Sequence, residues 1–177
     1  MADPLDQGRQ SFGRQAWADA FAQLSAADRE TRLAPEDLER LATAAYLLGR
    51  DADSIDIWAR AHHDLLRRGD LERAARCAFW LSFILLNKGE LVRGGGWVAR
   101  ARRLLDDGQL DCVEQGYLLL PVALQSFAEG DAATAYATFG QAAKIGDRFR
   151  DPDLVTLAQL GRGQALTRLG EIAQGMA

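Results

Sequence analysis

Hydrophobic residues recur every three to four positions along almost the whole chain, which is the period of an amphipathic helix. Short glycine turns such as "LGRD" at 48, "RGDL" at 68, "KGEL" at 88 and "EGDA" at 129 separate these segments, and no stretch between them alternates like a strand. We therefore predict an all-α protein, with residues 1–8 as a disordered tail. The predicted helices cover residues 9–26, 35–48, 52–68, 70–88, 90–106, 110–129, 131–147 and 152–169, with a ninth beginning at 171.

Pro121 is the one proline that falls inside a predicted helix. Its ring removes the hydrogen bond to the carbonyl of Tyr117, and this predicts a kink in the helix over 110–129.

The turn glycines mark an internal repeat. Gly49, Gly89, Gly130 and Gly170 follow one another at intervals of 40, 41 and 40 residues. Side chains recur in register with them: large residues nine positions after the glycine, and small residues five positions after, twelve positions after and seven positions before it. These are Trp58, Val98 and Phe139; Ser54, Gly94 and Ala135; Ala61, Ala101 and Ala142; and Ala42, Ser82, Ala123 and Gly163. The register predicts units of two helices that pack through these small residues.

Three consecutive glycines, Gly94 to Gly96, stand near the start of the predicted helix 90–106. Anion binding would need a phosphate-loop motif or a preceding strand, and the sequence has neither. Gly94 falls at a phase where every unit carries a small residue, so we predict that it serves helix packing. Gly95 and Gly96 each cost about 1 kcal/mol relative to alanine in a helix interior. They predict a helix that is weak or bent at its start.

This pattern resembles the tetratricopeptide repeat (TPR), a pair of antiparallel helices A and B whose small residues allow close approach. The resemblance covers residues 9–177, with units of about 40 residues in place of the usual 34 or so. It implies a TPR-like right-handed superhelix. The proline that usually ends helix B is replaced by Leu66, Asp106 and Asp147, so the turns between units are expected to differ in sharpness.

In the TPR arrangement one face of the A helices lines a concave groove that receives partners. The resemblance implies a non-catalytic interaction domain whose groove binds a protein or peptide segment, or an apolar small-molecule effector. The alternative is that the aromatic residues Phe79, Phe83 and Phe127 simply pack between neighbouring helices. The groove residues implied are Tyr46, Arg76, Phe79, Phe83, Asn87, Tyr117, Leu120, Leu124, Phe127, Leu160, Gln164 and Arg168.

Composition and candidate chemistry leave little room for an enzyme. The net charge is -4 without a basic tail, so no nucleic-acid contact is expected from this segment. The chain shows no apolar run of about 18 residues and no leader pattern, and we expect a cytoplasmic protein without a membrane contact.

His62 and His63 are adjacent on one helix and point about 100° apart, which disfavours a shared metal. Cys77 and Cys112 read as buried thiols. We expect no catalytic residue, metal or cofactor.

Four phrases resemble a narrower family: "APEDLERLATAAYLLGRD", "RGDLERAARCAFWLSFILLNKGE", "GWVARARRLLDD" and "DCVEQGYLLLP". They look like the repeat region of bacterial LuxR-type transcriptional regulators, in which such an array precedes a C-terminal helix-turn-helix domain. The resemblance implies the sensory or assembly part of a regulator. No DNA-contacting residue is carried over, and the alternative is a stand-alone TPR adaptor that scaffolds two proteins.

The sequence ends at "LGEIAQGMA", seven residues past Gly170. A solenoid normally ends in a polar capping helix. We therefore expect that the repeat domain is truncated within its last hairpin and continues in a longer protein. The alternative expectation is a homodimer formed through the uncapped C-terminal hairpin.

Overall fold

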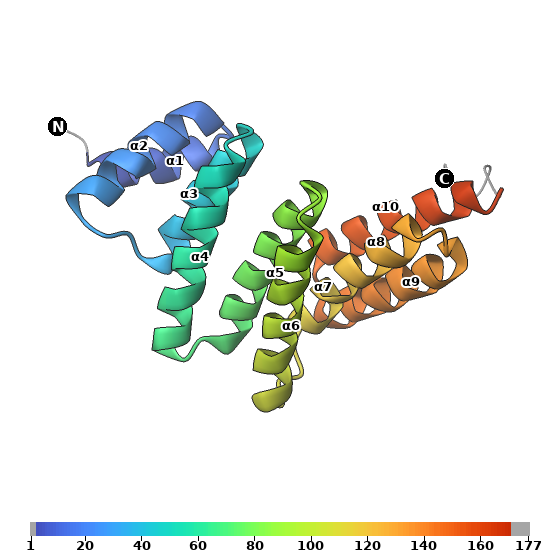
Figure 1. Cartoon of the computed structure of the whole chain (residues 1–177). Helices are drawn as coiled ribbons and strands as arrows, with labels where there is room; N and C mark the ends of the chain where they lie inside the picture. The colour runs from blue at the N-terminus through green and yellow to red at the C-terminus, as the bar shows by residue number, and fades with distance from the viewer. Residues whose placement is uncertain (1–2, 171–177) are drawn as a thin grey trace.

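The computed structural model describes residues 3–170, and this part of the chain is helical with short connections (Figure 1). The helices are α1 Pro4–Gly13, α2 Trp17–Glu30, α3 Pro35–Leu47, α4 Asp51–Arg68, α5 Leu71–Asn87, α6 Leu91–Asp107, α7 Glu114–Tyr117, α8 Leu119–Ala128, α9 Ala132–Phe149 and α10 Pro152–Arg168. The predicted all-α class is confirmed. The predicted ninth helix and the proposed C-terminal dimer surface fall largely outside the described residues.

Successive helices pack side by side as α1 with α2, α3 with α4, α5 with α6, and α8 with α9, and α10 then packs on α9. The turns between them contain Gly49, Gly69, Gly89 and Gly130, whose φ angles lie between 72° and 91°. Glycine reaches this left-handed region without steric cost, which explains its recurrence at these turns. The regularly spaced glycines of the sequence therefore occupy the turns of the fold.

Small and large residues meet in the core as the repeat predicts. Ala61, Ala101 and Ala142 are fully buried, and Trp58 and Phe139 are almost fully buried. The buried side chains form two clusters, one across α2 to α5 and one across α5 to α10. Because α5 contributes to both clusters, it is the central helix of the array.

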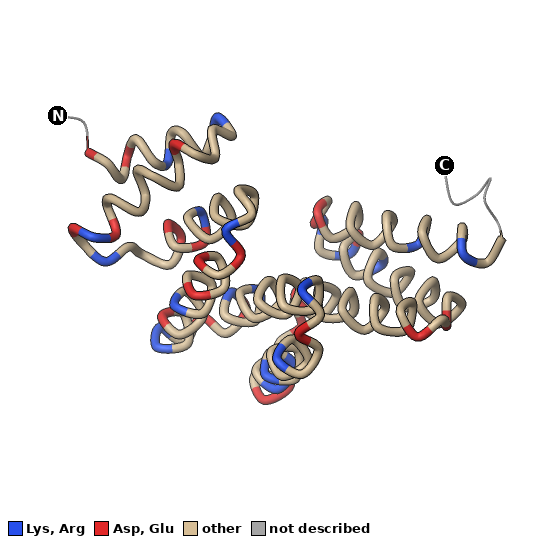
Figure 2. The backbone as a smooth tube through the Cα atoms, turned by 45° about the horizontal axis from the view of Figure 1, so that its top comes forward, with Lys and Arg blue, Asp and Glu red and all other residues tan. Residues whose placement is uncertain are grey.

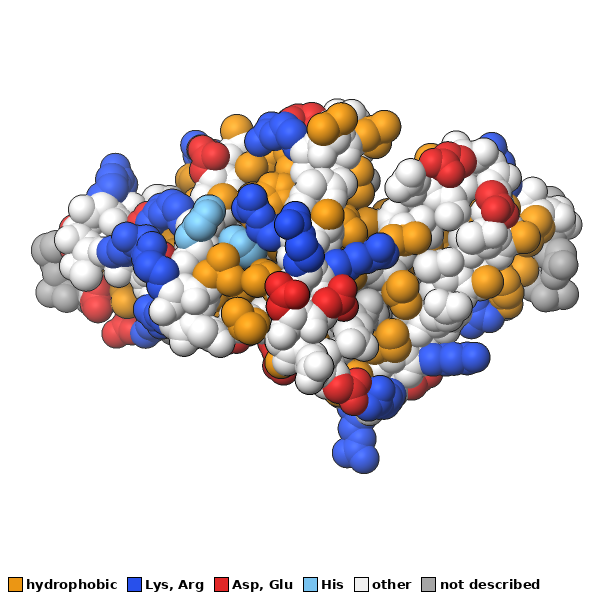
Figure 3. Space-filling view, turned by 60° about the horizontal axis from the view of Figure 1, so that its bottom comes forward, with side chains coloured by type: hydrophobic (Ala, Val, Ile, Leu, Met, Phe, Trp, Pro, Cys, Tyr) orange, Lys and Arg blue, Asp and Glu red, His pale blue; other side chains and the backbone are white. Residues whose placement is uncertain are grey.

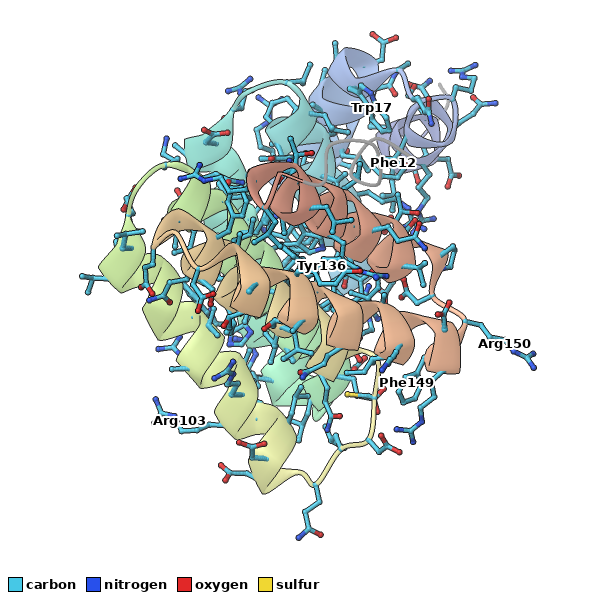
Figure 4. The ribbon with its side chains drawn as sticks, turned by 90° about the vertical axis from the view of Figure 1, so that its right-hand side faces the viewer. Phe12, Trp17, Arg103, Tyr136, Phe149 and Arg150 are labelled. Carbon is cyan, nitrogen blue, oxygen red and sulfur yellow. The ribbon has the colours of Figure 1, made fainter. Side chains whose placement is uncertain are left out.

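The N-terminal prediction is wrong. Residues 4–8 belong to α1 instead of a disordered tail, and the predicted helix 9–26 is divided by a turn at Gln15, whose φ is 59°. The side chain of Asp3 accepts a hydrogen bond from the amide of Leu5 at 3.0 Å and so caps α1. Phe12 and Trp17 then meet edge to face across the turn, with ring centroids 5.3 Å apart (Figure 4).

The segment around Pro121 is broken as expected. The predicted helix 110–129 starts only at Glu114 and is divided at Leu118 into α7 and α8. The division lies where Pro121 lacks the amide hydrogen that would reach the carbonyl of Tyr117.

The triple glycine lies inside α6, which runs unbroken through it. A Cβ atom on Gly94 would lie 2.7 Å from Cγ of Leu86 and 3.2 Å from the carbonyl oxygen of Ser82, so the packing role of Gly94 is confirmed. Gly95 and Gly96 face open space. The expected break or loosening at the start of α6 is not seen in this structure.

The array bends around α5 and α6. Figure 2 shows the N-terminal and the C-terminal helices rising on the same side of this central pair. Among the described residues, no helix combines the length and the apolar character needed to cross a membrane.

Candidate functional site

The residues predicted to line a groove divide into a buried and an accessible group. Phe79, Tyr117 and Leu120 retain 0%, 2% and 3% of their accessible surface and belong to the core cluster of α5 to α10. These three are corrected to core residues, because the bend of the array packs α7 and α8 directly against α5. The alternative of packing between helices is therefore right for Phe79.

The accessible group is concentrated at one edge of the array. Tyr46, Asn87, Phe127 and Arg168 stand in the last turns of α3, α5, α8 and α10. These are the A helices, and because they alternate with the B helices they run in the same direction, so their C-terminal ends lie along one edge. We call these four residues, together with Gln164 one turn before Arg168, the A-helix rim. Asn87 and Arg168 are exposed, and Tyr46 and Phe127 are partly buried.

The rim combines apolar surface with hydrogen-bonding groups. The guanidinium carbon of Arg168 lies 5.6 Å from the ring centroid of Phe127, which links α10 to α8. Phe83 and Leu124 are partly buried and lie one turn before Asn87 and Phe127 on α5 and α8. Gln164 and Leu160 on α10 are exposed, Leu160 at 62%. Tyr136 lies between α9 and α10 (Figure 4), where its hydroxyl accepts a hydrogen bond from Arg162 at 2.6 Å.

Arg76, another predicted groove residue, is engaged in a polar network. It donates to Glu114 at 3.0 Å and lies 3.5 Å from a carboxylate oxygen of Asp151. Its guanidinium carbon stacks 3.8 Å from the ring centroid of Tyr117, whose hydroxyl donates to Asp151 at 3.0 Å. Burial, the largest cause, and the hydrogen bond to Asp151 raise the pKa of Tyr117 above its usual value. The network ties α5 to α7 and α10.

Sequence reasoning missed the acidic partners of Arg76. Glu114 follows it by 38 residues, which is close to one repeat length. The same kind of spacing joins Arg73 to Glu36 and Arg148 to Asp111, each across 37 residues. Opposite charges about one repeat apart are therefore the signal that could have found these contacts.

The histidines and cysteines have structural surroundings. His62 is fully buried, and its Nδ1 lies 2.8 Å from the carbonyl oxygen of Ala74, whereas His63 is exposed and contacts the carbonyl of its own helix. Cys77 and Cys112 are free and buried, and desolvation is the largest cause that raises the pKa of each thiol. No group of three or more His, Cys, Asp or Glu side chains that could hold a metal occurs within residues 3–170.

Two surface hollows lie in the N-terminal half, away from the predicted groove residues. One of about 580 Å³ opens between α2 and α4 beside Phe21, Ile57 and the ion pair of Arg60 with Asp28. The other, of about 320 Å³, lies where the connection between α2 and α3 meets the end of α4. Sequence reasoning gave no indication of either hollow, because the residues that line them are distant in sequence.

Comparison with known proteins finds solved structures of similar fold, but no matching family or curated protein. Neither a family model nor a curated protein matches the sequence. A solved structure of the Rap conjugation gene regulator of the plasmid pLS20 in complex with the Phr* peptide is similar with a TM-score of 0.78 at 15% identity, covering 98% of this chain and 49% of that one. The chain thus spans about half the length of that regulator.

Two further solved structures share the fold. PlcR of Bacillus thuringiensis in its apo form has a TM-score of 0.64 at 16% identity, covering 96% of this chain and 67% of that one. A putative kinesin light chain of Podosopora anserina with nearly identical TPR-like repeats has a TM-score of 0.59 at 13% identity, covering 98% and 88%. The protein therefore has a TPR-like helical-repeat fold.

Proposed function

We propose that this chain is a non-catalytic interaction domain that binds a peptide segment along the A-helix rim. The single observation that carries the proposal is the contact of exposed Arg168 on α10 with the partly buried ring of Phe127 on α8, at the same helix ends as exposed Asn87. Amide groups can pair with the backbone of an extended peptide, and aromatic rings can receive its apolar side chains. The similar Rap regulator is in complex with the Phr* peptide, which supports a peptide as the partner.

The charges of the rim favour an acidic and apolar peptide. Arg168 has no acidic partner in the described part of the chain, whereas Arg76 is already neutralised by Glu114 and Asp151. A carboxylate of the peptide would therefore pair with Arg168, next to an apolar side chain on Phe127. Binding would act by population shift, because a ligand that contacts α5, α8 and α10 together favours one curvature of the array.

A displayed library of random peptides tests the rim. The whole chain is panned against the library, and the enriched peptides are titrated calorimetrically into the wild type and into N87A, Q164A and R168A. These three side chains are exposed, so their removal should leave the helical circular dichroism signal intact. We expect each variant to weaken binding about fivefold or more. R102A, an exposed arginine on α6, is the matched control.

Enrichment of peptides that bind all variants equally would contradict the rim as the binding site. A small apolar effector is a second candidate occupant, and competition of such a compound with the enriched peptides would identify it.

We further propose that the domain is the sensory part of a bacterial, cytoplasmic transcriptional regulator of the LuxR type. The resemblance of the repeat phrases and the similarity of the fold to that of the Rap regulator and PlcR support it. The alternative is an adaptor without DNA-binding output. Reading the genomic frame downstream of codon 177 separates the two, since only the regulator needs a basic helix-turn-helix domain there.

A further inference from the structure

A hollow of about 320 Å³ at the outer corner of the N-terminal half is surrounded by three arginine side chains. We call it the arginine hollow. It lies at the N-terminal end of α3 and the C-terminal end of α4, and hence at the edge of the array opposite to the A-helix rim. Figure 3 shows Lys and Arg side chains gathered on this face beside the histidines. Its lining residues are Arg32, Leu33, Ala34, Asp64, Arg67 and Arg68.

Positive charge exceeds negative charge in the hollow. Oδ1 of Asp64 accepts hydrogen bonds from Nη2 of Arg32 at 2.6 Å and from Nη2 of Arg67, so two guanidinium groups converge on one carboxylate oxygen. Nε of Arg32 also donates to Oδ2 at 3.3 Å. The side chain of Arg68 forms no ion pair or hydrogen bond within the described residues. Three cations against one anion leave a net charge of about +2 in the hollow.

Most donors of these arginines remain available. A guanidinium carries five N–H donors, of which Arg32 uses two and Arg67 uses one in the contacts with Asp64. Their side chains are 60% and 64% exposed. Both side chains are therefore accessible to a ligand from solvent.

Two further carboxylates, Asp28 and Glu36, lie near the hollow but outside its lining, and each is hydrogen-bonded to an arginine that is also outside the lining. Asp28 is held by both terminal nitrogens of Arg60, at 2.8 and 2.9 Å, and accepts the amide of Leu33. Glu36 accepts a hydrogen bond from Arg73 at 2.7 Å and shares this arginine with Glu39 and Asp70. The hydrogen bond from Arg73, as the largest cause, and the charge of Arg68 both lower the pKa of Glu36, so Glu36 offsets part of the charge of Arg68. α3 begins next to the hollow at Pro35, and its first turn carries Glu36 and Asp37, whose charges offset the positive end of the helix dipole.

We propose that the arginine hollow is a binding site for a phosphate group in its doubly negative form. Guanidinium groups bind phosphate oxygens in bidentate fashion, and a charge of about -2 matches the excess charge of the hollow. A single carboxylate would leave one positive charge unmatched. The proposal goes beyond peptide binding at the rim and is independent of it, because the two sites share no residue and lie at opposite edges.

Titration calorimetry of the full chain with inorganic phosphate tests this site, with sodium chloride at equal ionic strength as the reference. We expect saturable binding of phosphate that weakens about tenfold in R68Q, because one set of charge-assisted hydrogen bonds is lost. Arg68 contacts no other side chain by hydrogen bond or ion pair in the described residues, so the variant should fold like the wild type. R102Q on α6 is the matched control and should bind as the wild type does.

A second variant moves the affinity in the opposite direction. D64N removes the only negative charge of the hollow lining, so phosphate should bind more tightly than to the wild type. Capped O-phosphoserine distinguishes the source of the phosphate: binding of inorganic phosphate and phosphoserine alike indicates a site for the group itself, and binding of phosphoserine alone indicates a modified protein segment. Absence of saturable binding of both, or equal affinity of wild type and R68Q, would overturn the proposal.

Discussion

The ring of Phe139 fills the space that a side chain at position 161 would need. A Cβ atom on Gly161 would lie 2.4 Å from both Cε1 and Cζ of that ring, which no real side chain tolerates. Phe139 is the large residue of its repeat unit on α9, and Gly161 lies on the next A helix, α10. The pair shows how one aromatic residue and one missing side chain fix the approach of neighbouring helices.

We expect G161A to destabilise the protein by about 1–3 kcal/mol, because the added methyl group forces the ring of Phe139 from its position in a packed core. G140A on the neighbouring helix is the control, since a Cβ there meets nothing within 4 Å. It should stabilise α9 by up to about 1 kcal/mol through helix propensity. Urea unfolding followed by circular dichroism measures both, and equal effects would contradict the steric explanation.

The triple glycine of α6 provides a second set of matched variants. G95A and G96A should each raise the free energy of unfolding by about 0.5–1 kcal/mol, because both positions are helical and open. G94A should lower it, since its Cβ would meet Leu86 at 2.7 Å. The same urea titration tests all three. If G95A or G96A lowered the free energy of unfolding instead, the two positions would not be open, and the helix-propensity explanation would be wrong.

α1 is docked through an ion pair between half-exposed Arg9 and a buried carboxylate. Nε and Nη2 of Arg9 donate to the two carboxylate oxygens of Asp37 on α3, at 2.9 and 2.7 Å, and Asp37 is 1% exposed. D37N should cost about 1–3 kcal/mol, because it weakens these charge-assisted hydrogen bonds in a buried place. D53N, which alters the exposed pair with Arg50, should cost at most about 1 kcal/mol. Thermal unfolding compares the two, and faster proteolysis of the α1–α2 turn in D37N would locate the effect.

The contact with Arg9 also sets the pH range over which Asp37 stabilises the fold. Hydrogen bonding to Arg9 is the first cause that lowers the pKa of Asp37 below its ordinary value of 3.8. A carboxyl with a lowered folded-state pKa stabilises the fold above the unfolded-state pKa and loses that contribution as the pH falls through the folded-state pKa. The difference in stability between wild type and D37N should therefore disappear in strongly acidic solution.

The repeat itself could be predicted because it is a local property of the sequence. Turn glycines such as Gly49 and Gly89 require positive φ angles, and buried alanines such as Ala61 mark each helix contact, so register and fold class follow from spacing. α1 was missed although Asp3 and Pro4 are an ordinary capping signal for it.

The open surface could not be predicted, because exposure depends on how the units are stacked. Phe79 and Phe83 lie one helical turn apart on the same helix, yet only Phe79 is fully buried, and the bend around α5 decides this. The arginine hollow was missed for a related reason: Arg32 and Asp64 are 32 residues apart and meet only when consecutive units pack.

His62 should make the stability of the fold depend on pH near neutrality. It is fully buried, with Nε2 unpartnered, and its ring meets Trp97 edge to face at 5.0 Å. Desolvation is the first cause that lowers its pKa below the ordinary 6.5, and the charges of His63 and Arg100 act in the same direction, against the hydrogen bond to Ala74. The folded protein therefore disfavours the charged form of His62.

In the unfolded chain the imidazole titrates near its ordinary value, so below about pH 6.5 the unfolded state binds more protons than the folded state. The stabilising contribution of neutral His62 is present above that pH and is lost as the pH falls. We expect the free energy of unfolding to fall from pH 7.5 to 5.5 by more in the wild type than in H62Q, whereas H63Q follows the wild type. Identical pH slopes for wild type and H62Q would show that His62 accepts its proton in the folded state as readily as in the unfolded chain.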